Sequence, residues 1–121
     1  MICGNKSVKW KQGNDIMYSN WEDLEKSISN CKKCKLCTNR NNIVFGQGNK
    51  NADIMLIGEG PGADEDRLGQ PFVGKAGKLM NSAFEGLEIK RDELYIANIV
   101  KCRPPANRVP EADEAEACLD Y

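Results

Sequence analysis

The sequence predicts an α/β fold with a partial doubly wound parallel sheet, and three segments carry that prediction. Residues 54–57 form a short, wholly apolar run, which suits a strand buried on both faces of a parallel sheet. Apolar residues recur at helical spacing between Gly74 and Gly86, and residues 94–100 read as a second strand. The order strand, helix, strand is a βαβ unit, which has a right-handed crossover. Two inner strands and one crossover make only part of a doubly wound sheet.

Upstream of this unit the sequence predicts a short helix, preceded by a segment with little order. Residues 1–18 show no periodicity, and we expect them to form a poorly ordered N-terminal extension. Ser19 and Glu22 have the spacing of a capping box, which predicts a helix that starts there and ends near Asn30. Its apolar residues share one face: Trp21, Leu24 and Ile28. Residues 19–121 then make one incomplete domain.

Beyond the second strand the chain is expected to be extended and then helical. Residues 104–110 contain three prolines and predict a stiff, extended segment. Pro110 and the acidic Glu111 mark the start of a helix that reaches Cys118. The sequence ends at Tyr121, three residues later, so we expect this helix to lack support at its end.

The composition narrows the possible functions. A net charge of −1 over 121 residues gives no general attraction to nucleic acids or membranes, so a polyanion site has to come from local clustering. No apolar run approaches the roughly 18 residues of a membrane span. The N-terminus lacks the apolar core of a signal peptide. We therefore expect a cytoplasmic, monomeric protein with no membrane partner. Histidine is absent, which removes the commonest general base.

Five cysteines are candidates for a metal site. Cys31, Cys34 and Cys37 follow one another at intervals of three, Cys102 directly follows the second strand, and Cys118 lies on the last helix. Without an export signal, metal binding by thiolates is favoured over disulfides. Four thiolates suit zinc or an iron–sulfur cluster, and the spacing does not separate the two. Either Cys34 or Cys37 can complete the local pair.

Three further features point to a ligand at the carboxyl end of the first strand. Residues 58–62 read Gly-Glu-Gly-Pro-Gly and form either a tight turn or a loop whose N–H groups approach a ligand. Glu59 lies where open α/β sheets bind ligands. Phe72 is either a core side chain or a stacking platform for a base. Asn98 interrupts an apolar strand and is either a satisfied structural amide or a reader of a base edge.

Basic residues cluster after the second strand. Lys101, Arg103 and Arg108 lie close together in the sequence, with two prolines among them. Such a strip either contacts phosphates or forms a solvated surface loop.

Five segments in unbroken order resemble the type-4 iron–sulfur uracil-DNA glycosylases, a family also described as phage DNA polymerase-related proteins. The segments are Cys-x-x-Cys-x-Leu (31–36), Val-Phe-Gly-x-Gly (44–48), Gly-Glu-Gly-Pro-Gly (58–62), Gly-x-Pro-Phe-Val-Gly-x-Ala-Gly (69–77) and Asn-Ile-Val-Lys-Cys-Arg-Pro-Pro-x-Asn-Arg-x-Pro (98–110). The resemblance covers residues 28–121. It implies a three-layer α/β/α uracil-DNA glycosylase-like fold and a base-excision repair enzyme that hydrolyses the N-glycosidic bond of flipped-out uracil in DNA.

The resemblance also implies a ligand set and a cofactor. The ligands would be Cys31, Cys34, Cys102 and Cys118, and the cofactor a 4Fe-4S iron–sulfur cluster, with zinc as the second choice. Cys37 falls at a position that the family does not need.

Most of the family's functional residues map onto three of these segments, 58–62, 69–77 and 98–110. Glu59 and Gly60 would line the uracil pocket, and other branches of the superfamily carry a catalytic Asp where this chain has Gly60. Phe72 would stack on the uracil, and Asn98 would hydrogen-bond its Watson–Crick edge. Glu65 and Asn107 would have supporting roles near the attacking water. Arg103 and Arg108 would contact DNA phosphates.

The chain also departs from the family. Its members continue with two more sheet strands and a His-Pro motif, whereas this chain has no histidine and ends at Tyr121. We therefore expect an N-terminal fragment or a truncated reading frame that lacks the C-terminal strands and has weak or no activity alone. Two other functions remain open. One is a metal-stapled nucleic-acid-binding module without catalysis. The other is a ferredoxin-type electron carrier, which would need a fourth cysteine soon after Cys37.

Overall fold

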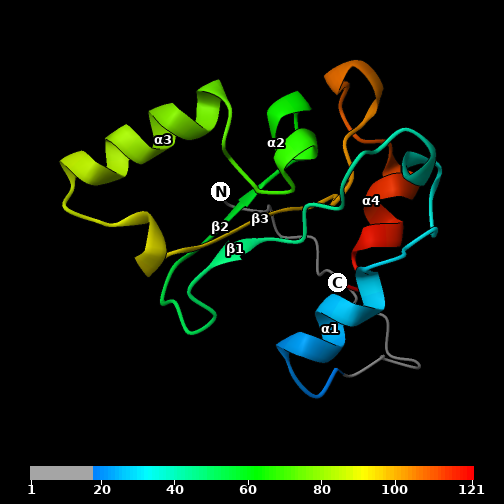
Figure 1. Cartoon of the computed structure of the whole chain (residues 1–121), viewed down its shortest axis with the longest axis horizontal. Coiled ribbons are helices and arrows are strands. Elements are labelled where there is room, and N and C mark those ends of the chain that lie inside the picture. The colour runs from blue at the N-terminus through cyan, green and yellow to red at the C-terminus, as the bar shows by residue number, and fades with distance from the viewer. Residues whose placement is uncertain (1–17) are drawn as a thin grey trace, which may run out of the picture.

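Three short strands form the sheet in this computed structural model, which describes residues 18–121 (Figure 1). Strand β3 (Tyr95–Asn98) lies between β1 (Gln47–Gly48) and β2 (Met55–Gly58). Strands β2 and β3 are parallel, as predicted, and their register ends with Gly58 opposite Asn98. Strand β1 runs antiparallel to β3, so the sheet is mixed. Apart from Tyr18, the expected N-terminal extension lies outside the described residues.

The two inner strands differ in burial, which corrects one expectation. All four residues of β3 are buried, because this strand is central. The run at residues 54–57 was expected to be buried on both faces, yet the side chain of Ile57 is 61% exposed and Met55 is 52% exposed. Strand β2 is an edge strand, and among the described residues no further strand pairs with it.

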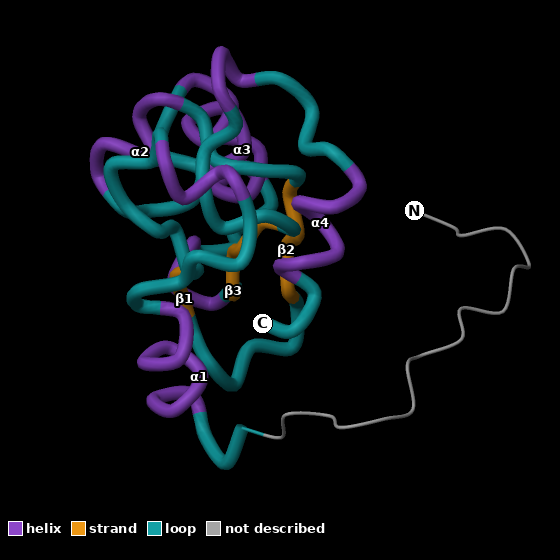
Figure 2. The backbone as a smooth tube through the Cα atoms, turned by 90° about the vertical axis from the view of Figure 1, so that its right-hand side faces the viewer, coloured by secondary structure: helices purple, strands orange, loops and turns teal. Residues whose placement is uncertain are grey.

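Four α-helices surround the sheet: α1 (Trp21–Ile28), α2 (Ala63–Leu68), α3 (Lys75–Gly86) and α4 (Ala112–Cys118). In both views α2 and α3 lie on the opposite side of the sheet from α1 (Figures 1 and 2). This arrangement agrees with the predicted partial α/β fold. None of the described helices is long and apolar enough to cross a membrane.

Helix α1 begins one residue later than its predicted capping box. Asn20, not Ser19, is the N-cap, and its side-chain oxygen accepts from the amide of Asp23 at 2.9 Å. The predicted apolar face is confirmed, since Ile28 is buried and Trp21 is half-buried. The Trp21 ring packs against the Tyr95 ring at 4.8 Å between centroids, which joins α1 to the central strand.

Helix α2 was not predicted, because the acidic run that follows the glycine-rich loop reads as loop. The helix begins where the Glu65 carboxylate accepts from the amide of Gly62 at 3.2 Å, and it ends at Gly69, whose φ of 71° closes it in the left-handed region. Buried Asp66 connects the helix to the loop before β1 by accepting from the amides of Asn41 (2.8 Å) and Asn42 (3.2 Å).

Helix α3 lies where its apolar spacing predicts, but its apolar face is only partly covered. Met80 and Phe84 are half-buried, whereas Leu79 and Leu87 are more than two-thirds exposed, at 73% and 68%. The periodicity therefore predicts the helix correctly and overstates its packing.

The segment before α4 is bent, not extended as its prolines predict. Residues Pro105–Asn107 form a 3-10 turn, and both Ala106 (φ 53°) and Asn107 (φ 55°) are left-handed. Helix α4 itself is confirmed. The expectation that its end lacks support is wrong. Lys33 pairs with Asp120 at 3.1 Å and lies 4.5 Å from the centre of the Tyr121 ring.

Replacing Asp66 by Asn should destabilise the fold. Asp66 is 1% exposed, and its two carboxylate oxygens accept three hydrogen bonds, so an amide would place donors against donors. We expect Asp66→Asn to lower the free energy of unfolding by roughly 1.5–3 kcal/mol, as for hydrogen bonds to charged groups. Chemical denaturation measures this change. The matched control is Asp64→Asn on the same helix, whose exposed pair with Arg67 should contribute less than about 1 kcal/mol. Equal losses in the two variants would contradict the prediction.

Candidate functional site

The aromatic ring of Phe72 and the carboxamide of Asn98 meet over Gly58. A methyl group built on Gly58 would lie 2.5 Å from Phe72 Cζ and 2.4 Å from Asn98 Oδ1. Gly58 ends β2 opposite Asn98 in β3, so the parallel pair itself brings the two residues together. Only glycine at this position leaves space for both side chains.

Asn98 is 3% exposed, and the hydrogen bond that it accepts from a side chain is made by the main-chain carbonyl, not by the carboxamide. The carboxamide is nevertheless not a fully buried group without a partner, since Glu65 Oε2 is the side-chain atom of that kind among the described residues. The backbone around it is fixed, because Lys101 Nζ donates to the Asn98 carbonyl at 2.7 Å. Lys101 is itself buried and is therefore not part of a solvated basic strip.

Phe72 has an unusual backbone conformation. Its φ is 51°, a region that residues with a side chain rarely adopt. Its carbonyl lies so close to helix α3 that a methyl group on Gly77 would be 1.9 Å from the oxygen. Gly77 therefore lets the loop bearing Phe72 lie directly against the helix.

A cleft of about 220 Å³ lies along the loop that follows Gly58 and gathers the residues that were predicted to act near the water, although neither Phe72 nor Asn98 lines it. Its walls include Glu59, Gly60, Glu65, Asn107 and Arg108. The two carboxylates in the cleft differ, since Glu59 is exposed and Glu65 is half-buried. Glu65 Oε1 accepts from the Gly62 amide, whereas Glu65 Oε2 is buried without a partner among the described residues.

The predicted phosphate-binding arginines are both engaged within the protein. Arg103 Nε donates to Asn107 Oδ1 at 2.8 Å. Arg108 donates through both terminal nitrogens to Glu114, at 2.6 and 2.8 Å, and Glu114 is fully buried. The hydrogen bonds from Arg108 lower the pKa of Glu114 to about 2. This bidentate pair anchors the loop that carries Asn107 onto helix α4.

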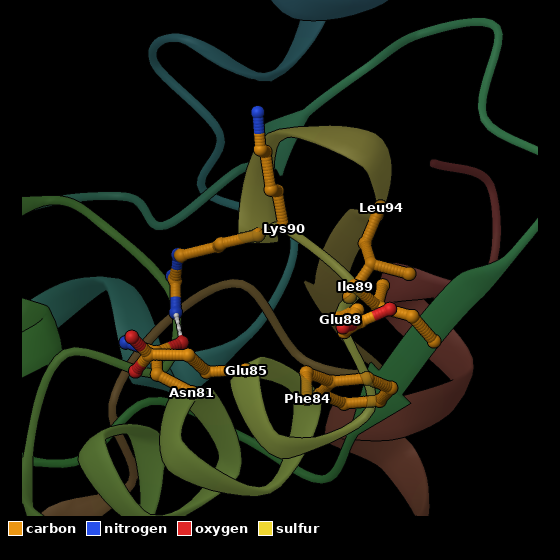
Figure 3. A pocket seen from close by; sticks show the side chains of 8 residues that line it. Asn81, Phe84, Glu85, Glu88, Ile89, Lys90 and Leu94 are labelled. Carbon is orange, nitrogen blue, oxygen red and sulfur yellow. Dashed lines mark hydrogen bonds between the residues drawn. The ribbon is translucent and has the colours of Figure 1, made fainter.

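A larger hollow of about 530 Å³ lies away from the predicted site, between α3 and the turn before β3 (Figure 3). Asn81, Phe84 and Leu94 are among its walls. None of the residues predicted to bind uracil, DNA or metal lines it.

Three of the four cysteines that the resemblance selects, Cys34, Cys102 and Cys118, lie in one region. Cys102 and Cys118 are buried with Leu36 and Val100, and Cys34 packs against this group. Burial raises the pKa of Cys102 to about 11, opposed by a hydrogen bond from Arg40 at 3.4 Å. In the described part of the chain, no group of three or more acidic, histidine or cysteine side chains is assembled for a metal ion.

Cys31 reaches the same region through Tyr121. Burial, and then a side-chain hydrogen bond with Cys31, raise the pKa of Tyr121 to about 12. Burial also raises the pKa of Cys118. Neither Cys31 nor Cys37 is among the side chains that pack against the buried cysteines, whereas Cys34 is. Of the two candidates for the local pair, Cys34 therefore lies against Cys102 and Cys118.

Sequence reasoning missed Glu114 and the role of Lys101. Glu114 has a weak signal in the sequence, because it lies three residues after Glu111 and accepts the Glu111 amide at 2.8 Å, as a capping residue does. Lys101 carries no such signal, since its contact with Asn98 depends on how the chain turns after β3.

Comparisons with known proteins relate this arrangement to one superfamily. A model of the uracil DNA glycosylase superfamily matches residues 45–121. A type-4 uracil-DNA glycosylase of Pyrobaculum aerophilum is 48% identical over 83% of this chain and 51% of its own length. A type-4 enzyme of Thermotoga maritima is 45% identical over 84% and 55%. A DNA polymerase of Bacillus phage SP01 is 40% identical over 63% of this chain and 8% of the polymerase. The chain thus spans about half the length of its type-4 relatives.

The Arg108–Glu114 pair predicts a pH dependence of stability. Because the folded pKa of Glu114 is about 2, below its ordinary 4.5, the pair stabilises the fold fully above pH 4.5 and less as pH falls toward 2. We expect the difference in free energy of unfolding between wild type and Glu114→Gln to shrink over that range. Denaturant titrations at several pH values measure it. Glu85→Gln, on the exposed face of α3, is the control and should show no such trend. A difference independent of pH would contradict the pair's role.

Proposed function

Because this chain belongs to the uracil DNA glycosylase superfamily, we propose that it carries the uracil-recognition site of a uracil-DNA glycosylase. Such an enzyme hydrolyses the N-glycosidic bond of a uracil flipped out of DNA. The observation that supports this most directly is the carboxamide of buried Asn98, which lies beside the Phe72 ring over Gly58.

Asn98 and Phe72 supply recognition by complementary means. The Asn98 side chain accepts from uracil N3–H and donates to O4, whereas cytosine presents the reversed pattern and would leave both groups unpaired. Phe72 replaces the stacking that the base loses when it leaves the duplex. Gly58 keeps both side chains at one point, so that one base can contact them together.

The reaction then uses the cleft along the loop that follows Gly58. The bond between C1′ and N1 breaks, its electron pair leaves with uracil as an anion, and the oxocarbenium-like sugar takes up a water. Main-chain N–H groups of residues 58–60 stabilise the anion, since Pro61 has no N–H and that of Gly62 donates to Glu65. Glu59 and the unpartnered oxygen of Glu65 accept hydrogen bonds from the water, and its proton passes through them to solvent. Gly60 leaves the cleft open, and Asn107 supports its far wall.

The same proposal includes a 4Fe-4S iron–sulfur cluster held by Cys31, Cys34, Cys102 and Cys118. When bound, the cluster supplies a structural cross-link and no redox step in hydrolysis. The thiols fit this role because they come from two distant segments and because Cys102 and Cys118 are already buried together. Free thiols of this kind suit a reducing compartment, so we place the protein in the cytoplasm. We also propose that it is a monomer.

Arg103 and Arg108 contribute to DNA binding in this proposal. Both are half-buried and lie on the bent loop between β3 and α4. Because Arg108 is held by Glu114 and lines the cleft, its position is fixed close to the sugar that reacts. Among residues 18–121, Arg103 donates from Nε to Asn107, and its two terminal nitrogens would reach a phosphate.

The proposal is tested with two single-stranded oligonucleotides that differ only in one uracil or cytosine, and the affinity measurement uses the same 2′-fluoro sugar at that nucleotide in both strands. The 121-residue chain is assayed for uracil release, and its affinity is measured for the hydrolysis-resistant 2′-fluoro version of each strand. We expect tighter binding of the uracil strand. Equal affinity for both strands would refute the uracil site and favour a nucleic-acid-binding module without catalysis.

Replacing Asn98 by Ala should remove the preference for uracil. Two hydrogen bonds of about 1.5 kcal/mol each correspond to a loss on the order of 10²-fold in uracil affinity. Affinity for the cytosine strand should not change. Fluorescence anisotropy with the two strands measures both values. Asn51→Ala, in the exposed turn before the start of β2, at the opposite end of that strand from Gly58, is the control and should bind as wild type does. A preference for uracil that survives Asn98→Ala would refute the assignment.

Single cysteine replacements test the cluster. After anaerobic reconstitution with iron and sulfide, the wild type should be brown and contain iron and acid-labile sulfide in equal amounts. We expect Cys34→Ser to lose the colour and most of the iron, and Cys37→Ser to retain both. Zinc analysis of protein purified without added metal covers the alternative. If Cys37→Ser lost its iron and Cys34→Ser retained it, Cys37 and not Cys34 would be the ligand.

A further inference from the structure

The guanidinium of Arg91 grips the loop that carries Phe72. Arg91 begins the 3-10 turn Arg91–Glu93 just before β3. Its Nη1 donates to the carbonyl of Phe72 at 3.0 Å, and its Nη2 donates to the carbonyl of Pro71. One side chain therefore fixes two consecutive peptide groups at the aromatic residue.

Two other side chains hold the guanidinium itself in place. Asn81 Oδ1 on α3 accepts from Nη1 at 2.9 Å, which is the dashed line in Figure 3, and Gln47 Oε1 on β1 accepts from Nη2 at 3.5 Å. All four acceptors are uncharged oxygens, so among the described residues Arg91 forms no ion pair. The arrangement orients a planar donor, and it does not neutralise a charge.

The loop needs such a grip because of the conformation of Phe72. Its φ of 51° lies in a region that residues with a side chain rarely adopt, so the surrounding structure has to hold it there. Gly77 lies directly against the Phe72 carbonyl on one side, and Arg91 donates to the same oxygen. The peptide plane after Phe72 is thereby fixed from two directions, and the ring is carried over Gly58.

We propose that Arg91 is a positioning residue that sets the plane of the Phe72 ring for stacking on the flipped base. The inference rests on the proposed function in one respect, that Phe72 stacks on uracil. Arg91 touches neither base nor sugar in this role and acts only through the two carbonyls. A lysine cannot replace it, because a single ammonium group does not span two consecutive carbonyls as the guanidinium fork does.

The test is a double-mutant cycle between Arg91 and Phe72 in the full 121-residue chain. We expect Arg91→Lys to weaken the preference for the 2′-fluoro uracil strand over the matched cytosine strand about tenfold, an effect within the range that one base stack contributes. In the Phe72→Ala background, Arg91→Lys should have no further effect, because the group it positions is gone. Equal effects of Arg91→Lys in both backgrounds would overturn the proposal. Arg67→Lys, an exposed pair on α2, is the control and should bind as wild type does.

Two additional measurements keep the test decisive. If Arg91→Lys does not fold, Asn81→Ala takes its place, since it removes the acceptor that orients Nη1, and its smaller effect should likewise vanish in the Phe72→Ala background. Amide hydrogen exchange needs no substrate. Exchange at residues 72–77 should become faster in Arg91→Lys while β3 stays protected, and unchanged exchange would overturn the grip. If the wild type shows no preference for uracil, the proposed function fails, and exchange alone then decides whether Arg91 holds the loop.

Discussion

The close approach at Gly58 is the constraint on which the rest of the site depends. Because β2 and β3 are parallel and in register there, Gly58 faces Asn98 across the sheet. Any side chain at Gly58 would displace both the Phe72 ring and the Asn98 carboxamide. The surrounding polar contacts serve this one junction, since Lys101 fixes the backbone of Asn98 and Arg91 fixes that of Phe72. The proposed recognition geometry therefore depends on the parallel strand pair and on these two side chains, Lys101 and Arg91.

The cysteine region depends on weaker forces. The pairs of Lys33 with Asp120 and of Lys35 with Glu111 are exposed, and exposed pairs contribute about 1 kcal/mol or less. The Arg108–Glu114 pair is stronger but lies at the other end of α4. What joins the carboxyl end of α4 to the segment around Cys34 is a small buried group that includes Cys102 and Cys118. A structural cluster would therefore add a cross-link where exposed ion pairs and one small buried group hold the two segments together.

The sequence was sufficient for features that depend on local pattern, and insufficient for those that depend on distant contacts. The helical spacing placed α3, and the apolar runs placed the parallel pair, because each pattern reports local periodicity. Helix α2 was missed because its acidic first turn resembles a loop, although Gly69 marks its end. The roles of Arg91 and Lys101 could not be predicted, because each donates to a carbonyl whose position is set only when the chain folds.

The exposed face of β2 carries none of the residues proposed to recognise the base. Met55 and Ile57 belong to an apolar run suited to burial, yet both are about half or more exposed in the described residues, and the chain spans about half the length of its type-4 relatives. Recognition does not depend on that face, because Asn98 belongs to the fully buried strand β3 and Phe72 is held from the side of α3 and Arg91. In the proposed function, binding of uracil and turnover are therefore separable. The residues proposed to select the base lie together in the described structure, whereas the proposed bond cleavage also depends on what encloses the cleft around Glu59.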